Sequence, residues 1–266
     1  LELKHIDWNT SASILAKLQK YEAVHPIEGW EDLQRRLMID RRCFGFFHPA
    51  LKDEPLIFVQ VALSKKYSDN ISLILNQEHI LDSVDEATHA TFYSISNCQD
   101  GLRGISFGSF LIKQVSEKLR SEFPNLRHFA TLSPMPTFRC AVEKGIVEVS
   151  SEENNQALEL LKGGSDDDKL VDLAPDRLRI IAAKYLTQTT NGRLLDPVAR
   201  FHLGNGAVLD RINVGANMSS DGLKQSFGLM VNYHYDLQSL EQNHEQFHES
   251  GKIAMGRSVL KLMKQA

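Results

Sequence analysis

The chain of 266 residues carries 30 Lys and Arg against 34 Asp and Glu, a formal net charge of −4. It therefore lacks the basic excess of a nucleic-acid binder, and an anionic ligand must be held by local groups. Hydrophobic residues make up 42% and charged residues 24%, as in ordinary soluble globular proteins. No apolar run approaches the roughly 20 residues of a membrane span, so neither nucleic acid nor a membrane is expected as a partner.

Three widely spaced cysteines, Cys43, Cys98 and Cys140, form no Cys-x-x-Cys pair. An odd, scattered set of this kind is typical of reduced thiols, so we expect a cytoplasmic protein. The N-terminal sequence has no signal-peptide pattern and begins without Met. We therefore expect the chain to be a fragment of a longer protein.

Hydrophobic periodicity and turn residues predict alternating helices and strands along the first half of the chain. Helices are expected at 10–22 and 30–40, strands at 43–49 and 55–64, a strand or short helix at 70–78, and a strand at 89–97. A glycine-rich turn then leads into an amphipathic helix, and a strand follows at 126–134. This strand–turn–helix–strand order is that of a βαβ-like unit.

The second half begins with a polar, acidic stretch that predicts a helical excursion at about 140–190, with a loop at 163–168. It includes a helix at 175–188. Strands are expected at 206–217 and 227–237, and a terminal helix at 250–264. The pattern as a whole predicts an α/β protein.

The glycine-rich turn at 101–109 is the first candidate for a binding site. Gly101, Gly104 and Gly108 let backbone N–H groups approach an anion at a helix N-terminus. The turn resembles the signature of the GNAT acyltransferase fold, which cradles the pyrophosphate of coenzyme A. A purely structural turn is the alternative. Contacts to coenzyme A would fall on Arg103, Gly104, Ser106, Gly108 and Ser109.

Ser133 is the second candidate, because it stands at the end of a predicted strand and directly before Pro134. Active sites of open sheets gather at such strand ends. A serine before proline is also a common turn-former, which is the alternative. The chain has no G-x-S-x-G elbow, so a hydrolase nucleophile is not expected.

His202 is the third candidate, within the segment "DPVARFHLGNGAVLDRIN" at 196–213. The segment could be a strand entering a hairpin, or a short helix at 197–204 with Asp196 as N-cap and Pro197 at its first position. The imidazole could be a hydrogen-bonded core histidine or an acid–base group aimed at a substrate.

Several segments together resemble the malonyl-CoA decarboxylase family, in its C-terminal catalytic domain and in a bacterial form. They are "YEAVHPI" (21–27), "FYSISNCQDGLRGISFGSFLIKQV" (92–115), "TLSPMP" (131–136), "DPVARFHLGNGAVLDRIN" and "GLMVNYHY" (228–235). The resemblance implies one GNAT-like domain over 1–266, a mixed central sheet flanked by helices. It also implies that the family's N-terminal helical domain, which helps assembly, is absent, and that the full-length protein is a homo-oligomer.

The resemblance implies conversion of malonyl-CoA to acetyl-CoA and carbon dioxide, in fatty acid metabolism, with no metal, biotin or other cofactor. The family's catalytic serine and histidine fall on Ser133 and His202. Its Asn-Tyr-x-Tyr word falls on Asn232, Tyr233 and Tyr235, and Tyr235 is the one expected near the site. Decarboxylation leaves an enolate, and backbone N–H groups around Ser94–Ser96, where the strand is expected to bulge, would stabilise its oxyanion.

One departure concerns the turn, where relatives carry a glutamate and this chain has Ser106. Any role of that carboxylate is absent here. Two other functions stay open: a GNAT acyltransferase that moves an acyl group to an amine, and a sensor that binds malonyl-CoA without consuming it. A soluble α/β domain in which the turn and His202 are purely structural is the remaining alternative.

Overall fold

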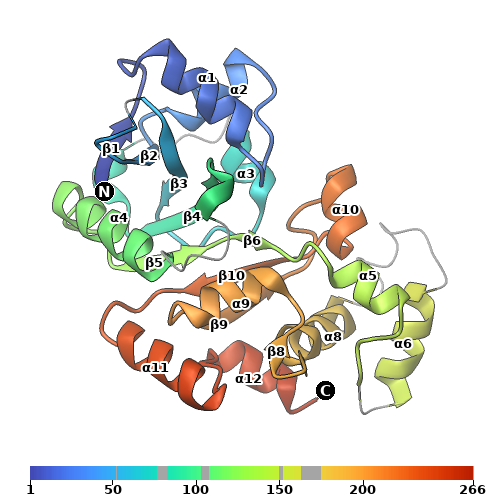
Figure 1. Ribbon diagram of the computed structural model, residues 1–266. Helices are drawn as coiled ribbons and strands as arrows, with labels where there is room; N and C mark the ends of the chain where they lie inside the picture. The colour runs from blue at the N-terminus through green and yellow to red at the C-terminus, as the bar shows by residue number, and fades with distance from the viewer. Residues whose placement is uncertain (52, 77–82, 103–107, 150–151, 163–174, 266) are drawn as a thin grey trace. The chain divides into compact units, whose positions relative to one another are not determined.

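The computed structural model describes residues 1–51, 53–76, 83–102, 108–149, 152–162 and 175–265 (Figure 1). The chain divides into two compact units, Leu1–Thr131 and Leu132–Ala266. Each unit has its own core and is described by itself. The expectation of one domain over 1–266 stays a prediction.

The first unit alternates strands and short helices. Its elements are β1 (Glu2–Ile6), α1 (Ala12–Tyr21), α2 (Trp30–Arg36), β2 (Arg41–Phe47), β3 (Pro55–Ser64), α3 (Ile71–Leu75), the 3-10 helix η1 (Val84–Glu86), β4 (His89–Asn97), the 3-10 helix η2 (Asp100–Leu102), α4 (Gly108–Glu122) and β5 (His128–Thr131).

The strands of this unit form a mixed sheet in the order β1-β2-β3-β4-β5. Neighbouring strands from β1 to β4 pair antiparallel, whereas β4 and β5 pair parallel. Parallel strands need a long crossover connection, and α4 lies in the connection between these two. The mixed α/β architecture expected from the sequence is confirmed.

Helices cover both faces of this sheet (Figure 1). On one face, Leu15 and Leu18 of α1 join Leu33 of α2 in a core with Cys43 and Phe58 from the sheet. On the other face, Phe110 of α4 lies 6.4 Å from Phe46 of β2, measured between ring centroids. Successive residues of a strand face opposite sides of the sheet, so β2 contributes side chains to the helix layers on both faces.

β4 has two irregularities near its C-terminal end. Its register against β3 shifts between the pairs Val61–Phe92 and Gln60–Ser94, which makes Tyr93 the extra residue of a β-bulge. Its parallel pairing with β5 runs from His89 to Phe92. From Tyr93 onward, the edge of β4 is therefore not engaged by the described part of β5. The bulge expected in this strand is confirmed, at Tyr93–Ser94.

The second unit contains more helix than strand. Its elements are β6 (Ser133–Pro134), α5 (Phe138–Glu143), α6 (Glu152–Lys162), α8 (Pro175–Thr187), β7 (Thr189–Thr190), β8 (Arg193–Leu194), α9 (Pro197–Gly204), β9 (Val208–Asn213), α10 (Ser220–Ser226), β10 (Met230–His234), α11 (Leu240–Ser250) and α12 (Arg257–Met263). β10 pairs antiparallel with both β6 and β9, and β7 pairs with β8.

The sequence predictions differ from the structure at a few elements. No strand was predicted at β1, and no helix at α10 or α11. The predicted strand at 126–134 is two strands, β5 and β6, separated at Leu132. The stretch at 70–78 contains a short helix, α3, whose first turn is capped by the side chain of Asn70. The loop expected at 163–168 lies outside the described residues.

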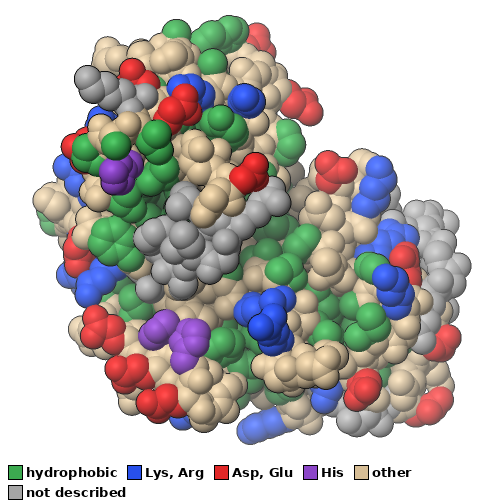
Figure 2. Space-filling view, in the orientation of Figure 1, with side chains coloured by type: hydrophobic (Ala, Val, Ile, Leu, Met, Phe, Trp, Pro, Cys, Tyr) green, Lys and Arg blue, Asp and Glu red, His purple; other side chains and the backbone are tan. Residues whose placement is uncertain are grey.

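Within the described residues, no helix combines the length and the apolar character that crossing a membrane requires. On the face of the molecule shown in Figure 2, acidic and basic side chains are interspersed rather than gathered by sign. This agrees with the small net charge and leaves anion binding to local groups.

Candidate active site

His202 lies on a short, well-capped helix in the second unit. The side chain of Asp196 accepts a hydrogen bond from the backbone N–H of Ala199 at 2.7 Å, and Pro197 occupies the first turn of α9. Asp196 also accepts a bond from the hydroxyl of Tyr185 in α8 at 2.9 Å. The helical interpretation of 197–204 is therefore confirmed, and the strand entering a hairpin is wrong because this cap starts a helix.

Both ring nitrogens of His202 have hydroxyl partners. Nε2 lies 3.1 Å from Oγ of Ser133, and Nδ1 lies 2.8 Å from the hydroxyl of Tyr235. The ring also stacks on Tyr233, with centroids 4.6 Å apart and an interplanar angle of 25°. Two hydrogen bonds in the plane of the ring and one stacking contact against its face hold the imidazole in a defined orientation.

This cluster is withdrawn from solvent, with exposed fractions of 6% for Ser133, 4% for His202 and 1% for Tyr235. Burial lowers the pKa of His202 to about 3, because a buried imidazolium loses its hydration. The ring is therefore neutral near pH 7. A neutral imidazole has one donor and one acceptor nitrogen, so the hydroxyls of Ser133 and Tyr235 take opposite hydrogen-bonding roles towards it.

Two strands bring Ser133 and the tyrosines to His202. Ser133 in β6 pairs with Val231 of β10, so the serine is held beside the strand that leads to the tyrosines. Tyr233 lies in β10 and Tyr235 directly follows its last residue, His234; residues two apart along an extended chain share a face. Tyr233 stacks on the imidazole and Tyr235 bonds to its edge. Tyr233 belongs to the Asn-Tyr-x-Tyr word but was not predicted near the site, and the i, i+2 spacing is the signal that could have placed it there with Tyr235.

Asn232 does not share these contacts. Its side-chain oxygen accepts a bond from Nδ2 of Asn213 in β9 at 2.8 Å. The register of β10 against β9 shifts between Asn232 and Tyr233, which separates the asparagine from its tyrosine neighbours. A substrate-binding role for Asn232 stays a prediction.

Ser94 and Ser96 lie in the bulged part of β4, in the first unit, and both are buried. The Ser94 hydroxyl donates to the carboxylate of Glu22, with distances of 2.8 and 2.7 Å to its two oxygens. Ser96 accepts a bond from the backbone N–H of Ala23 at 3.2 Å. Both hydroxyls are thus engaged within the protein. The sequence analysis missed Glu22, although it lies in the "YEAVHPI" segment.

The glycine-rich turn is described in part. Arg103, Gly104 and Ser106 lie outside the described residues. Gly108 and Ser109 are the first two residues of α4, a helix of 15 residues. The expected transition from turn to helix is confirmed at this point, and the phosphate contacts assigned to these five residues stay predictions.

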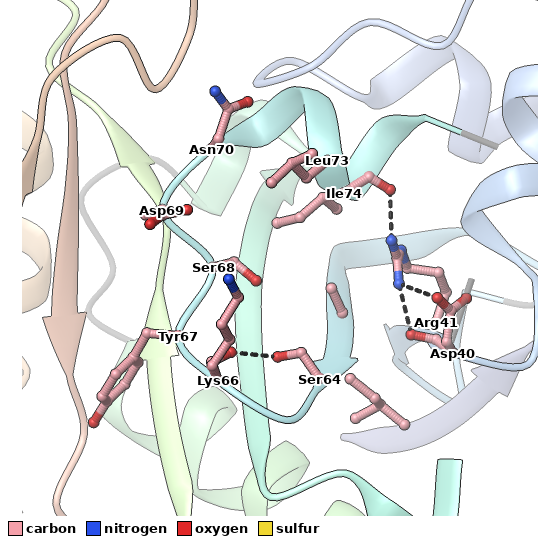
Figure 3. Close-up of a pocket in the computed structure, with 12 residues that line it drawn as sticks. Asp40, Arg41, Ser64, Lys66, Tyr67, Ser68, Asp69, Asn70, Leu73 and Ile74 are labelled. Atoms are coloured by element: carbon pink, nitrogen blue, oxygen red, sulfur yellow. Dashed lines mark hydrogen bonds and ion pairs between the residues drawn. The ribbon is translucent and has the colours of Figure 1, made fainter. Parts of the chain in front are cut away.

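A hollow of about 230 Å³ opens in the first unit, and no predicted site residue is among those that line it (Figure 3). Ser64, Lys66 and Asn70 line it, and Arg41, paired with Asp40, closes one side. Because Ser64 pairs with His89, the hollow lies at the N-terminal end of β4, opposite the bulge. Among the residues described, no three His, Cys, Asp or Glu side chains are grouped so that they could hold a metal ion.

Comparison with known proteins assigns the family. A family model of the malonyl-CoA decarboxylase C-terminal domain matches residues 1–266. The chain belongs to this family. The mitochondrial malonyl-CoA decarboxylase of Rattus norvegicus is 35% identical over 295 residues, covering 100% of this chain and 59% of that protein.

Similar solved structures support the assignment to the malonyl-CoA decarboxylase family and show which fold the chain has. The malonyl-CoA decarboxylase from Agrobacterium vitis has a TM-score of 0.91 and 48% identity, covering 98% of this chain and 66% of that chain. A GNAT-like decarboxylase in complex with isobutyryl-CoA has a TM-score of 0.54 at 18% identity, covering 89% of this chain and 100% of that chain, which shows the GNAT-like fold alone. This member of the malonyl-CoA decarboxylase family thus spans about 60% of the length of its relatives.

Proposed function

We propose that this chain catalyses the decarboxylation of malonyl-CoA to acetyl-CoA and carbon dioxide. The observation that carries the proposal is the buried series of hydrogen bonds Ser133–His202–Tyr235, in a chain of the malonyl-CoA decarboxylase family. The relatives named above are malonyl-CoA decarboxylases, which supports malonyl-CoA as the substrate.

The reaction breaks the bond between the α-carbon and the carboxylate of the malonyl group. The electron pair of that bond moves through the α-carbon to the thioester oxygen, carbon dioxide leaves, and an enolate remains. One proton is then added to the α-carbon to give acetyl-CoA. The protein must therefore stabilise an oxyanion and deliver one proton.

His202 and Ser133 are proposed to handle the carboxylate and the proton. A neutral His202 can donate a hydrogen bond without pairing strongly with the carboxylate, whose negative charge has to be lost as carbon dioxide. The arriving carboxylate would raise the pKa of the imidazole from about 3, because a nearby negative charge favours the protonated ring. Ser133 would donate to the carboxylate or to His202, and Tyr235 would hold the opposite side of the ring.

The first unit is proposed to bind the thioester and coenzyme A. The edge of β4 beyond Phe92 is free of the described β5 pairing, so its backbone N–H groups around Ser94–Ser96 are suited to the thioester oxygen. The N-terminus of α4 at Gly108 is suited to the pyrophosphate, together with Arg103, Gly104, Ser106 and Ser109.

Side chains and backbone amides supply both requirements, so we propose that the reaction uses no metal and no biotin. Activity should then persist after treatment with a chelator or with avidin. Assembly of the full-length protein into a homo-oligomer and its cytoplasmic location stay predictions.

Mass spectrometry of malonyl-CoA incubated with this chain alone tests the proposal. We expect acetyl-CoA to appear without any added acceptor, and its methyl group to gain one deuterium from D₂O. An acyltransferase would leave malonyl-CoA unchanged until an amine was added. A sensor would bind it, measured by calorimetry, and return it intact. Either of these outcomes would overturn the proposal.

A further inference from the structure

Glu22 is a buried carboxylate that the proposed chemistry does not use directly. It follows the last residue of α1, and its side chain is withdrawn from solvent, with 6% of the residue exposed. Oε1 accepts bonds from the backbone N–H groups of Val24 and His25, at 2.8 and 2.9 Å. These bonds bend the chain after α1 and direct the carboxylate away from solvent.

The same carboxylate reaches the two strands that form the bulge. Gln60 of β3 donates its side-chain amide to Oε2, and Ser94 of β4 donates its hydroxyl to both oxygens. Gln60 in turn accepts a bond from the hydroxyl of Tyr93 at 2.9 Å. The pair Gln60–Ser94 is where the register shifts, so Glu22 bonds to both sides of the bulge.

The residues after Glu22 hold the same part of β4. Ala23 donates its backbone N–H to the hydroxyl of Ser96, and the hydroxyls of Ser94 and Ser96 lie 3.2 Å apart. His25 is 7% exposed, and burial, with a smaller contribution from the charge of Arg36, lowers its pKa to about 4, against an opposing hydrogen bond with the backbone of Tyr93. The segment Glu22–His25 therefore contacts three residues of β4, namely Tyr93, Ser94 and Ser96, through side chains and backbone.

A bulged strand edge needs such a restraint. Tyr93 has no opposite residue in β3, and the described β5 pairing ends at Phe92, so the ladder holds the bulge less firmly than the rest of β4. Oxyanion stabilisation depends on donors that are already in place before charge develops. A displacement of about 1 Å in such a group lowers the rate by up to about 100-fold.

We infer that Glu22 is a positioning residue for the decarboxylation: through Ser94 and Gln60 it holds the β4 bulge so that its backbone N–H groups stay aligned with the thioester oxygen. This inference rests on the proposed function. In this inference the hydroxyls of Ser94 and Ser96 form hydrogen bonds within the protein, and the backbone N–H groups of β4 bind the substrate.

Infrared spectroscopy of bound acetyl-CoA, labelled with ¹³C at the thioester carbonyl, tests the inference. Donors at the oxygen polarise the carbonyl and lower its stretching frequency. We expect a shift to lower frequency in the unaltered chain and a smaller shift in Glu22→Gln, which keeps the shape of the side chain and loses its charge. Glu28→Gln, at an exposed glutamate six residues further along the chain, is the matched control and should leave the shift unchanged.

Kinetics supply a second measurement. Glu22→Gln should lower kcat by about tenfold or more, while the Kd of acetyl-CoA changes by less than about threefold, because coenzyme A contacts lie elsewhere in the proposal. A loss confined to KM or to the melting temperature, with kcat kept, would overturn the inference.

Ser94→Ala keeps the inference testable if Glu22→Gln does not fold. It removes the donor that joins the strand to the carboxylate, so it should reduce the infrared shift in the same direction. If the unaltered chain itself shows no shift, the amides of β4 do not bind the thioester and that part of the proposed function fails. If it shows a shift that Glu22→Gln and Ser94→Ala both retain, the positioning role alone fails.

Discussion

At the scale of single residues, the environment of His202 decides what its imidazole can do. A histidine exposed to water is half protonated near pH 6.5. Here the pKa falls to about 3, because the ring is buried between Tyr233, Ser133 and Tyr235 and a buried imidazolium loses its hydration. The ring is thus kept neutral and oriented.

Replacing either His202 or Ser133 by Ala should lower kcat for malonyl-CoA by about 100-fold or more. The reason is that each change removes one end of the 3.1 Å contact between the hydroxyl and Nε2. Release of acetyl-CoA followed by mass spectrometry measures the rate, and circular dichroism shows whether the fold is kept. His48→Ala, at an exposed histidine of the first unit, is the control. Near-normal turnover in a folded variant would remove that residue from the mechanism.

At the scale of elements, the sequence predicts α9 well, because its signals are local. Asp196 and Pro197 form a cap and first turn that need no distant contact. β4 and α8 are also predicted within a residue at each end, from dense apolar patterns. The sequence could not show that Ser133 and His202 meet, since 69 residues separate them and their contact depends on the tertiary packing of β6 and α9. α11 was missed because its only buried residue is Leu240, which leaves little apolar periodicity.

Asp196→Ala should lower the free energy of unfolding by about 2 kcal/mol. It removes the cap of α9 and one partner of the Tyr185 hydroxyl, both inside the protein. Asp196→Asn keeps an oxygen for the cap and should lose less. Urea unfolding measures both variants. Asp221→Ala, an exposed acidic residue in the first turn of α10, is the control for a general helix-terminus effect. Equal losses for Asp196→Ala and Asp221→Ala would contradict a special role of this cap.

The corner after α9 depends on one glycine. Gly206 has a φ of +84°, and a Cβ there would lie 2.1 Å from the backbone oxygen of Leu240. Gly206→Ala should therefore lower the free energy of unfolding by about 2–5 kcal/mol, from backbone strain and overpacking together. Gly251 has a φ of +69° with nothing within 4 Å, so Gly251→Ala carries the strain without the clash. Thermal unfolding of both variants separates the two effects, and similar melting temperatures would show that the close approach to Leu240 is relaxed at no cost.

At the scale of the whole molecule, each unit buries one histidine whose pKa is lowered. His202 in the second unit has a pKa of about 3, and His25 in the first has a pKa of about 4. The sequence could not reveal either value, because both arise from desolvation by residues that are distant along the chain. "YEAVHPI" contains His25 and Glu22 but does not show that Arg36 and the β4 bulge lie beside them. The net charge of −4 is a sum over the whole chain and gives no information about these interiors.

These two histidines should make the protein less stable in acid. Below about pH 6.5 the unfolded chain binds a proton at each histidine, whereas the folded chain stays neutral there until the pH reaches about 4 or 3. The unfolded state then binds more protons, so the free energy of unfolding falls as the pH is lowered from about 6.5 towards 4. The slope should correspond to as much as about two protons.

Urea unfolding of His202→Gln and His25→Gln at pH 7, 6, 5 and 4 measures this linkage. Each variant should lose stability at pH 7 and show a shallower pH dependence, by about one proton. Burial raises the pKa of Asp196, so the folded chain takes up a proton there at a higher pH than the unfolded chain does. This opposes the loss of stability near pH 4, and the test therefore compares each variant with the unaltered chain. A pH dependence as steep in both buried-site variants as in the unaltered chain would show that other groups cause the acid sensitivity.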